Sequence, residues 1–315
     1  MYKEKIDFIN DKLNGTDPQI PRFLCKYRPF DEYTFDMIEN EYLYLCPAKN
    51  LDDPSECTVS FSVQDYADID TCLLNIKCID LIIEIMRQYS TEENFNHSKE
   101  IIYNLIDSNG YIRNDWLIDA SFELEKLAPK EVVVNLVNWL ANIPKMLDDS
   151  TIRPQVEKLF LAAYNAREEI GICSLTPINN APQMWTDYAC NETGYCIEYD
   201  MTEYTHNNLI FPVIYQNDRQ NNILITILSD FVAQSIFGIS SGKLSGDRSN
   251  YIRMFLTKDT KWDYQQEWRI LGNGNTKIKS PNISAIHLGK NVSFDNKQAM
   301  LEYCKQHNII CKTST

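Results

Sequence analysis

Apolar and polar residues follow one another with strand or helix spacing in three successive zones of the chain. In the first zone, the pattern predicts strands over residues 22–28 and 42–46, which end at Pro29 and Pro47. Helical spacing of apolar residues predicts a helix over 33–41, between the two strands. The first zone therefore has mixed α and β character.

The second zone, about residues 62–169, carries apolar residues at three- and four-residue spacing almost throughout. No internal repeat is visible in it, so we expect one inserted helical bundle and not a solenoid. The predicted helices cover residues 72–89, 99–107, 114–126, 130–148 and 153–169.

The third zone returns to strand patterns. Strands are predicted over 169–175, 194–200, 210–216, from Trp268 onward, and over 283–288 and 309–312, with helices over 184–189, 221–237, 249–256 and 296–307. Strand-rich zones on both sides of the helical zone predict an α+β fold with a mixed or antiparallel sheet and a large all-helical insertion. The expected domains are an α+β core of residues 1–61 and 170–315 and a helical insertion of 62–169.

Composition narrows the possible functions. The 315 residues are 44% hydrophobic, and the net charge of −14 argues against a broad nucleic-acid footprint or binding to an anionic membrane. Ten cysteines occur without a C-x-x-C pair, so no metal site is expected. The first residues are charged and no apolar run approaches the length of a membrane span, which predicts a cytoplasmic protein.

The segment 258–271, KDTKWDYQQEWRIL, is the most informative part of the chain. It runs from polar residues into a strand pattern. Side chains two positions apart on a strand share a face, so Gln265 and Glu267 are expected to project together, with Arg269 two positions further on. A carboxylate beside an amide can bind a sugar hydroxyl and stabilise positive charge that develops on a ribose.

Two earlier strands carry polar side chains that suit a nucleotide. Tyr27 and Arg28 end the first strand, and an arginine fork can bind a pyrophosphate with two parallel hydrogen bonds. Ser174 and Thr176 place two hydroxyls on one face of a later strand, where they could bind a ribose or orient a catalytic glutamate. Each of these residues also has an ordinary interpretation, as a solvated arginine or a strand-end hydroxyl.

Two further groups of residues have alternative interpretations. Asp52, Asp53 and Glu56 form a polar turn, which is either structural or part of a divalent-metal nuclease site that draws a further carboxylate from Glu198 or Asp200. Separately, the predicted helix 184–189 has two aromatic residues three positions apart, which form either core or a base-stacking platform. They are Trp185 and Tyr188.

In order, the blocks K-Y-R, N-L-D-D-P-S-E, I-C-S-L-T, M-W-T-D-Y-A with G-Y-C-I-E-Y-D, and K-D-T-K-W-D-Y-Q-Q-E-W-R resemble a bacterial family known as domain of unknown function 2971 (DUF2971). The resemblance covers about residues 22–60 and 170–290 and leaves out the helical zone. The chain departs from the family's usual F-N-D-P-F-E turn at residues 51–56, and from its usual Y-E-x-E at residues 264–267.

The chain is also similar, more loosely, to ADP-ribosyltransferases of the R-S-E type, which implies a split sheet and NAD as substrate. By that resemblance Arg28 binds the NAD pyrophosphate, and Ser174 with Thr176 supports the nicotinamide ribose. Glu267 holds the ribose 2′-hydroxyl and stabilises the oxocarbenium ion, and Gln265 orients the acceptor nucleophile. Tyr27, Trp185 and Tyr188 complete the expected cofactor pocket.

Three functions follow as alternatives. The leading one is an NAD-consuming ADP-ribosyltransferase or NAD glycohydrolase, by analogy a bacterial toxin or anti-phage defence effector such as an abortive-infection protein. Its acceptor is a protein, a nucleic acid or a small molecule, and the helical insertion would suit a regulatory protein. The second is a non-catalytic sensor or interaction module of a defence system. The third is a carboxylate-rich metal-dependent nuclease.

Overall fold

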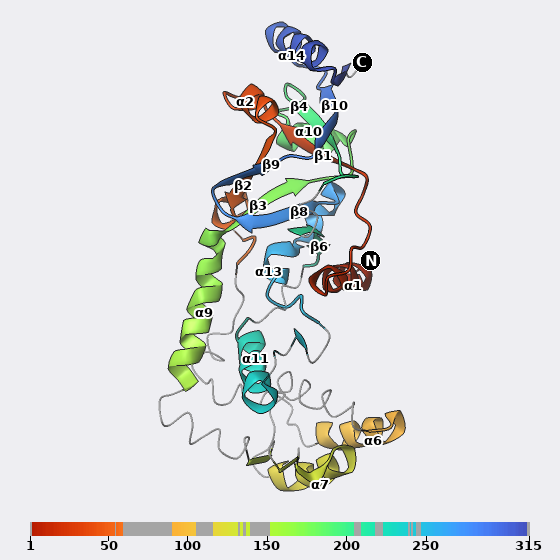
Figure 1. Cartoon of the computed structure of the whole chain (residues 1–315), viewed down its shortest axis with the longest axis vertical. Coiled ribbons are helices and arrows are strands. Elements are labelled where there is room, and N and C mark those ends of the chain that lie inside the picture. The colour runs from red at the N-terminus through yellow and green to blue at the C-terminus, as the bar shows by residue number, and fades with distance from the viewer. Residues whose placement is uncertain are drawn as a thin grey trace. The chain divides into compact units, whose positions relative to one another are not determined.

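A computed structural model shows the arrangement of the chain (Figure 1). The residues that it describes are 2–53, 55–58, 90–104, 116–131, 133–134, 137–138, 152–204, 209–217, 223–238, 240, 242–243 and 247–313. The predicted helix 72–89 and most of the predicted helix 130–148 lie outside these ranges. The fold is α+β, with mixed and antiparallel sheets, as the sequence predicts.

The chain separates into two compact units. The first comprises Met1–Cys57, Ala166–Asp218 and Phe255–Thr315, and the second comprises Thr58–Asn165 and Arg219–Met254. The second unit therefore includes a stretch near residue 240 that the sequence analysis assigns to the core. The predicted all-helical character of the insertion stays a prediction, because much of residues 62–169 lies outside the described part of the chain.

A five-stranded antiparallel sheet in the first unit has the strand order β5-β8-β3-β2-β9. Its central pair aligns Ser174 with Arg269 and Leu175 with Trp268. The strands are β2 (Tyr42–Pro47), β3 (Ile170–Leu175), β5 (Ile210–Pro212), β8 (Trp268–Asn273) and β9 (Thr276–Lys279).

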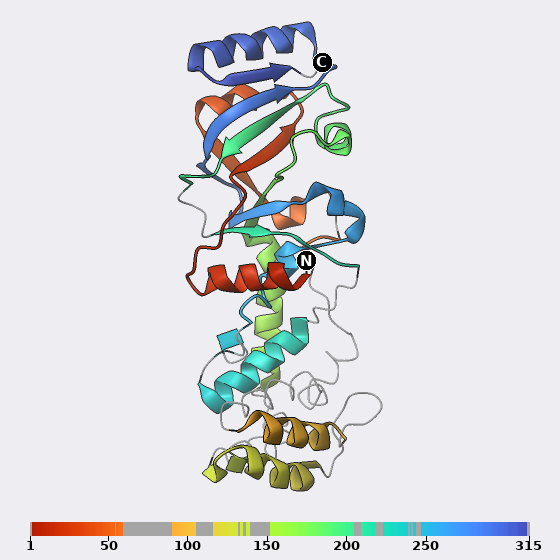
Figure 2. The same ribbon diagram turned by 90° about the vertical axis from the view of Figure 1, so that its right-hand side faces the viewer.

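A second, four-stranded sheet has the order β1-β4-β10-β11. Its pairs are antiparallel except for β10 with β11, which is parallel. The strands are β1 (Phe23–Arg28), β4 (Tyr195–Asp200), β10 (Asn282–Leu288) and β11 (Ile310–Thr313). The helix α14 (Phe294–His307) covers one face of this sheet (Figure 2), where Met300 and Cys304 pack into the core with Ile286.

Among the described residues, one isolated bridge joins the two sheets, between Cys25 on β1 and Thr176, which directly follows β3. The N–H of Cys25 donates to the carbonyl of Thr176 at 2.6 Å, and the N–H of Thr176 donates back at 2.9 Å. Two residues before Thr176, the carbonyl of Ser174 instead accepts from the Lys26 ammonium at 3.1 Å. The strand pair therefore opens on the side that carries Arg28 and Ser174.

Shorter elements complete the first unit. The N-terminal helix α1 contacts β5 and β6, where the Lys5 ammonium donates to the carbonyl of Val213 at 2.5 Å. These elements are α1 (Tyr2–Leu13), α2 (Thr34–Glu39), η1 (Ala48–Asn50), α10 (Pro182–Tyr188), β6 (Ile214–Tyr215), β7 (Thr257–Lys258) and the 3₁₀ helix η4 (Thr260–Gln265).

The remaining helices are α6 (Glu92–Tyr103), α7 (Trp116–Leu127), α9 (Ile152–Glu169), α11 (Ile223–Phe237) and α13 (Arg253–Leu256). The helices α7, α9 and α11 agree with the predicted helices to within about two residues. The helix α6 begins seven residues before the predicted helix 99–107, and α13 is shorter than the predicted helix 249–256. None of the helices that the structure describes is long and apolar enough to cross a membrane.

Two local features differ from the sequence prediction. The predicted strand 210–216 is divided into β5, which pairs with β8, and β6, which pairs with β7. Between them the N–H of Val213 donates to the carbonyl of Glu267 at 2.9 Å. Gln265, which was expected to share a strand face with Glu267, is instead the last residue of η4, and Gln266 has the left-handed conformation, with φ 42° and ψ 44°. The strand proper begins at Trp268.

Candidate active-site pocket

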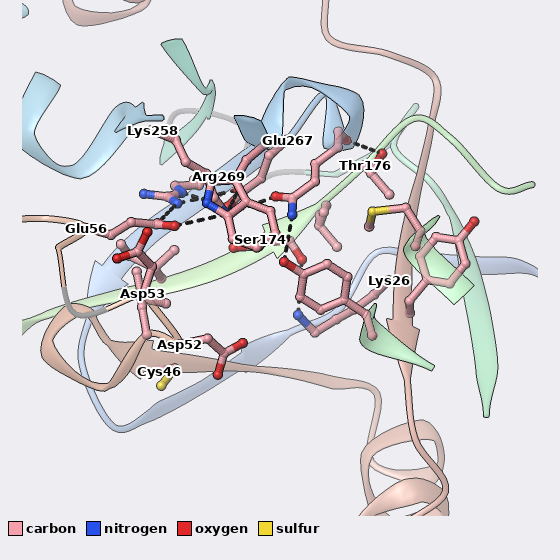
Figure 3. A pocket seen from close by; sticks show the side chains of 18 of the residues that line it. Lys26, Cys46, Asp52, Asp53, Glu56, Ser174, Thr176, Lys258, Glu267 and Arg269 are labelled. Carbon is pink, nitrogen blue, oxygen red and sulfur yellow. Dashed lines mark hydrogen bonds and ion pairs between the residues drawn. The ribbon is translucent and has the colours of Figure 1, made fainter. Parts of the chain in front are cut away.

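A pocket of about 580 Å³ lies where β1 and β3 separate (Figure 3). Its walls come from β1, β3, β8, the turn after η1, α10 and η4. It brings together nearly all of the residues predicted from the sequence: Tyr27, Arg28, Asp52, Asp53, Glu56, Ser174, Thr176, Tyr188, Gln265, Glu267 and Arg269.

Trp185 and Glu198 do not line the pocket. Trp185 is buried in a small core and packs edge-on against Tyr27, with ring centroids 5.0 Å apart. Of the two aromatic residues predicted as a stacking platform, only Tyr188 lines the pocket. The carboxylate of Glu198 instead accepts from Ser284 at 3.1 Å and lies 3.2 Å from a ring nitrogen of His287. In the nuclease alternative Glu198 or Asp200 supplies a further carboxylate. In the structure Glu198 instead binds residues of the four-stranded sheet, outside the pocket.

Four charged side chains form a buried quartet at one side of the pocket, which Figure 3 shows gathered beside Ser174. Arg269 donates through Nε to Glu267 Oε1 at 2.7 Å, and its Nη2 forms an ion pair with Glu56. Lys258 lies 3.0 Å from Glu267 Oε2 and 3.1 Å from Glu56 Oε1. Two cations and two carboxylates make the quartet neutral, which is how buried charges are tolerated.

Glu267 is ionised over the whole physiological pH range. Its side chain is only 4% exposed, and burial alone would raise the pKa of the carboxyl. The charges of Arg269 and Lys258 outweigh burial, and with help from the Ser174 hydroxyl they lower the pKa to about 2. The carboxylate is therefore a fixed negative group in the pocket wall.

Gln265 has both ends of its amide engaged. Its Oε1 accepts from the Lys258 ammonium at 2.9 Å, and its Nε2 donates to the Tyr188 hydroxyl at 2.7 Å and to the Tyr264 hydroxyl at 3.3 Å. Thr176 holds the backbone at this point, because its hydroxyl donates to the Gln265 carbonyl at 2.6 Å. Gln265 thus reaches the pocket through the turn at Gln266 and not through strand alternation.

Arg28 and Trp262 each carry a buried N–H group that has no hydrogen-bond partner among the residues that the structure describes. The atoms are Arg28 Nε and Trp262 Nε1. The other end of the Arg28 guanidinium is held, because Nη2 pairs with Asp31 at 2.9 Å. Both residues line the pocket, but these two nitrogen atoms are themselves buried below its surface.

The acidic turn of residues 52–56 lies on the pocket wall, but two of its three carboxylates, those of Asp53 and Glu56, bind other groups of the protein. Asp53 Oδ1 accepts from the backbone N–H of Ser55 at 2.9 Å, and Glu56 belongs to the quartet. Asp52 is exposed. Among the side chains that the structure describes, no group of three or more His, Cys, Asp or Glu residues is placed to hold a metal ion.

Sequence reasoning missed Lys26, Lys258, Lys261 and Trp262, which also line the pocket. Three of them belong to the segment 258–271 that the sequence analysis singled out. They were missed because only the strand end of that segment was interpreted chemically. The sequence did contain a signal for these residues: Lys258, nine residues before Glu267, begins a polar turn that leads to the glutamate.

Comparisons with curated proteins and with solved structures give no match. The sequence model of a protein family matches residues 184–270, which run from α10 to β8 and include Tyr188, Lys258, Gln265 and Glu267. That family is described as a protein of unknown function, DUF2971, and over these residues the resemblance seen in the sequence is confirmed.

Proposed function

We propose that this protein cleaves the N-glycosidic bond of NAD, either as an ADP-ribosyltransferase or as an NAD glycohydrolase. One observation carries the proposal: Arg28, Ser174 and Glu267, which are up to 239 positions apart (267 minus 28), line one pocket. A volume of about 580 Å³ lies in the usual range for small-molecule sites.

Ligand binding follows from the donors in the pocket. Arg28 lines the pocket, and a guanidinium can bind phosphate oxygens with parallel hydrogen bonds. Lys26 and Lys261 add positive charge to the lining, and the Tyr188 ring supplies an aromatic face. Burial raises the pKa of Tyr188 to about 12, so its hydroxyl stays protonated and can donate to a ligand. This set suits an anionic dinucleotide that carries flat rings.

The chemistry requires stabilisation of positive charge. When the bond between the anomeric carbon and the nicotinamide nitrogen breaks, the electron pair leaves with nicotinamide and the ribose becomes an oxocarbenium ion. Water or an acceptor then adds to that carbon and loses a proton. A fixed carboxylate in a partly dry site stabilises such an ion. Glu267 fills this role, and the Ser174 hydroxyl that contacts it helps to hold it.

The arrangement of the sheets supports the same proposal. The R-S-E resemblance implies a split sheet, and here β1 and β3 share an isolated bridge at Cys25 and Thr176 before they separate around the pocket. We keep the role of a toxin or phage-defence effector as part of the proposal, together with an unidentified acceptor.

The direct test is to incubate the protein with NAD and to quantify released nicotinamide. We expect release by the wild type and a loss of at least about 100-fold in Glu267→Gln, which corresponds to about 3 kcal/mol of transition-state stabilisation. Glu39→Gln, an exposed residue on α2, is the matched control and should leave the rate unchanged.

Glu267→Gln removes one member of a buried ion pair, which costs about 3–5 kcal/mol and can prevent folding. A second variant keeps the test informative in that case. Ser174→Ala removes only a hydroxyl and should slow the release by about 10-fold. Stabilisation of the wild type by NAD without nicotinamide release would favour a sensor module. No release and no stabilisation would overturn the proposal.

A further inference from the structure

Lys258 is a buried ammonium that none of the sequence motifs includes in the site. It ends the short strand β7, is 7% exposed, and lies under the Trp262 ring with its Nζ 5.4 Å from the ring centroid. Burial of a charged lysine is costly unless its donors are all satisfied. The partners of this ammonium therefore indicate its role in the pocket.

Three acceptor atoms surround its ammonium, two as hydrogen-bond partners and one as an ion-pair partner. Nζ lies 2.9 Å from Gln265 Oε1, 3.0 Å from Glu267 Oε2 and 3.1 Å from Glu56 Oε1. A lysine ammonium has three donors and no acceptor. Here it donates hydrogen bonds to Gln265 and Glu267 and forms an ion pair with Glu56. All three acceptors also line the pocket.

These bonds fix the orientation of two side chains on which the proposed chemistry depends. Glu267 is held at Oε1 by Arg269 and at Oε2 by Lys258, which leaves the carboxylate little freedom to rotate. Because Lys258 takes the carbonyl end of the Gln265 amide, the NH₂ end must point toward Tyr188. The ammonium thus determines which way round the amide lies.

Charge balance gives Lys258 a second effect. Without its positive charge, Glu56 and Glu267 would share the single cation Arg269, and the buried group would carry a net charge of −1. A like charge nearby and fewer cations both favour the protonated acid. A neutral carboxyl at position 267 could no longer stabilise an oxocarbenium ion.

We propose that Lys258 is a positioning residue of the pocket, which aligns the Glu267 carboxylate and the Gln265 amide and keeps the carboxylate ionised. The catalytic part of this inference rests on the proposed cleavage of NAD. The structural part, that Lys258 controls the ionisation of Glu267, does not depend on that activity.

The kinetic test compares Lys258→Met and Lys258→Arg with the control Lys277→Met. Lys277 is an exposed lysine on β9 that also pairs with a carboxylate, that of Asp36, and it lies outside the pocket. We expect Lys258→Met to lower kcat for nicotinamide release by about 100-fold, with KM for NAD changed less than about threefold. The acid limb of its pH–rate profile should move to higher pH.

Lys258→Arg separates charge from geometry. A guanidinium keeps the positive charge but presents a planar fork in place of three tetrahedral donors. The acid limb should therefore stay where it is in the wild type, while kcat falls by about 10-fold. A merely structural lysine would lower kcat in both variants in proportion to unfolded protein and would leave the acid limb in place.

The second arm uses ¹³C-glutamate labelling and NMR titration of the Glu267 carboxyl, assigned with Glu267→Gln. In the wild type we expect no titration above about pH 3.5, and in Lys258→Met a clear rise in the titration midpoint. A wild-type carboxyl that titrates near pH 4.5 overturns the inference, and so does an unchanged midpoint in a folded Lys258→Met. This arm decides the role of Lys258 even if wild-type protein releases no nicotinamide, which would count against the proposed function alone.

Discussion

Glu267 is the residue on which the charge balance of the pocket depends. Its folded-state pKa of about 2 lies below the ordinary value of 4.5, so the stability that it contributes is complete above about pH 4.5 and is lost as the pH falls toward 2. The size of this contribution is about 3 kcal/mol, since each pKa unit corresponds to about 1.4 kcal/mol.

We therefore predict that the unfolding free energy of the wild type falls more steeply between pH 5 and pH 2.5 than that of Glu267→Gln. Urea denaturation at a series of pH values measures this difference. The exposed Glu39→Gln should follow the wild type. Parallel acid dependence in wild type and Glu267→Gln would show that the carboxylate is not held by its cationic neighbours.

At the scale of elements, the turn at Gln266 joins η4 to β8 and places Gln265 beside Glu267. Its left-handed backbone is costly for a residue with a side chain and most costly for a β-branched one. We predict that Gln266→Val lowers the unfolding free energy by about 1–2 kcal/mol and reduces nicotinamide release. Gln266→Gly should equal or exceed the wild type in stability, and thermal melts of the two variants provide the measurement.

If Gln266→Gly were less stable than Gln266→Val, the left-handed conformation of residue 266 would be contradicted.

The same turn shows why strand alternation did not predict the position of Gln265 correctly. Gln265 and Glu267 both line the pocket, but their positions depend on the left-handed conformation of Gln266 between them. The pattern of apolar residues does not predict that conformation. The cause is local turn chemistry and not strand periodicity.

Close packing between Gly194, directly before β4, and the end of β1 sets the position of Arg28. A Cβ atom on Gly194 would lie 2.2 Å from the carbonyl oxygen of Arg28, which is backbone and cannot move alone. We predict that Gly194→Ala destabilises the protein by about 1–3 kcal/mol and weakens NAD binding. Gly272→Ala is the matched control, because there the nearest atom is a terminal methyl of Leu45, which can shift. Equal effects of the two variants would contradict this prediction.

The sequence predicts elements with a periodic apolar face well, but it does not predict contacts between residues that are far apart in the chain. Strands β1, β2, β3, β4 and β10 and helix α14 were predictable because each presents a regular apolar face to the core. The strand β9 was missed because its four residues alternate between half-buried and exposed and none is fully buried. The role of Lys258 was also missed, since only the folded chain brings its ammonium to Glu56, a residue 202 positions away (258 minus 56).

At the scale of the whole molecule, the net charge of −14 contrasts with a pocket lined by Lys26, Arg28, Lys258, Lys261 and Arg269. Four carboxylates, those of Asp52, Asp53, Glu56 and Glu267, line the same pocket, so its formal charge is +1 (five minus four). The pocket is therefore slightly positive within a protein that is acidic as a whole, which favours an anionic ligand there. Binding there should stabilise the folded chain, because the unfolded chain has no pocket.

We predict that NAD at 100 times its Kd raises the unfolding free energy by about 2.7 kcal/mol, which thermal shift assays detect as a concentration-dependent increase in Tm. Arg28→Lys keeps the charge but loses the planar fork, so it should weaken NAD binding by about 10-fold or more. Arg22→Lys is the matched control, because Arg22 is an exposed residue that pairs with Asp200 and does not line the pocket. If both arginine variants bind NAD as the wild type does, Arg28 does not contact the ligand and the pyrophosphate must lie elsewhere in the pocket.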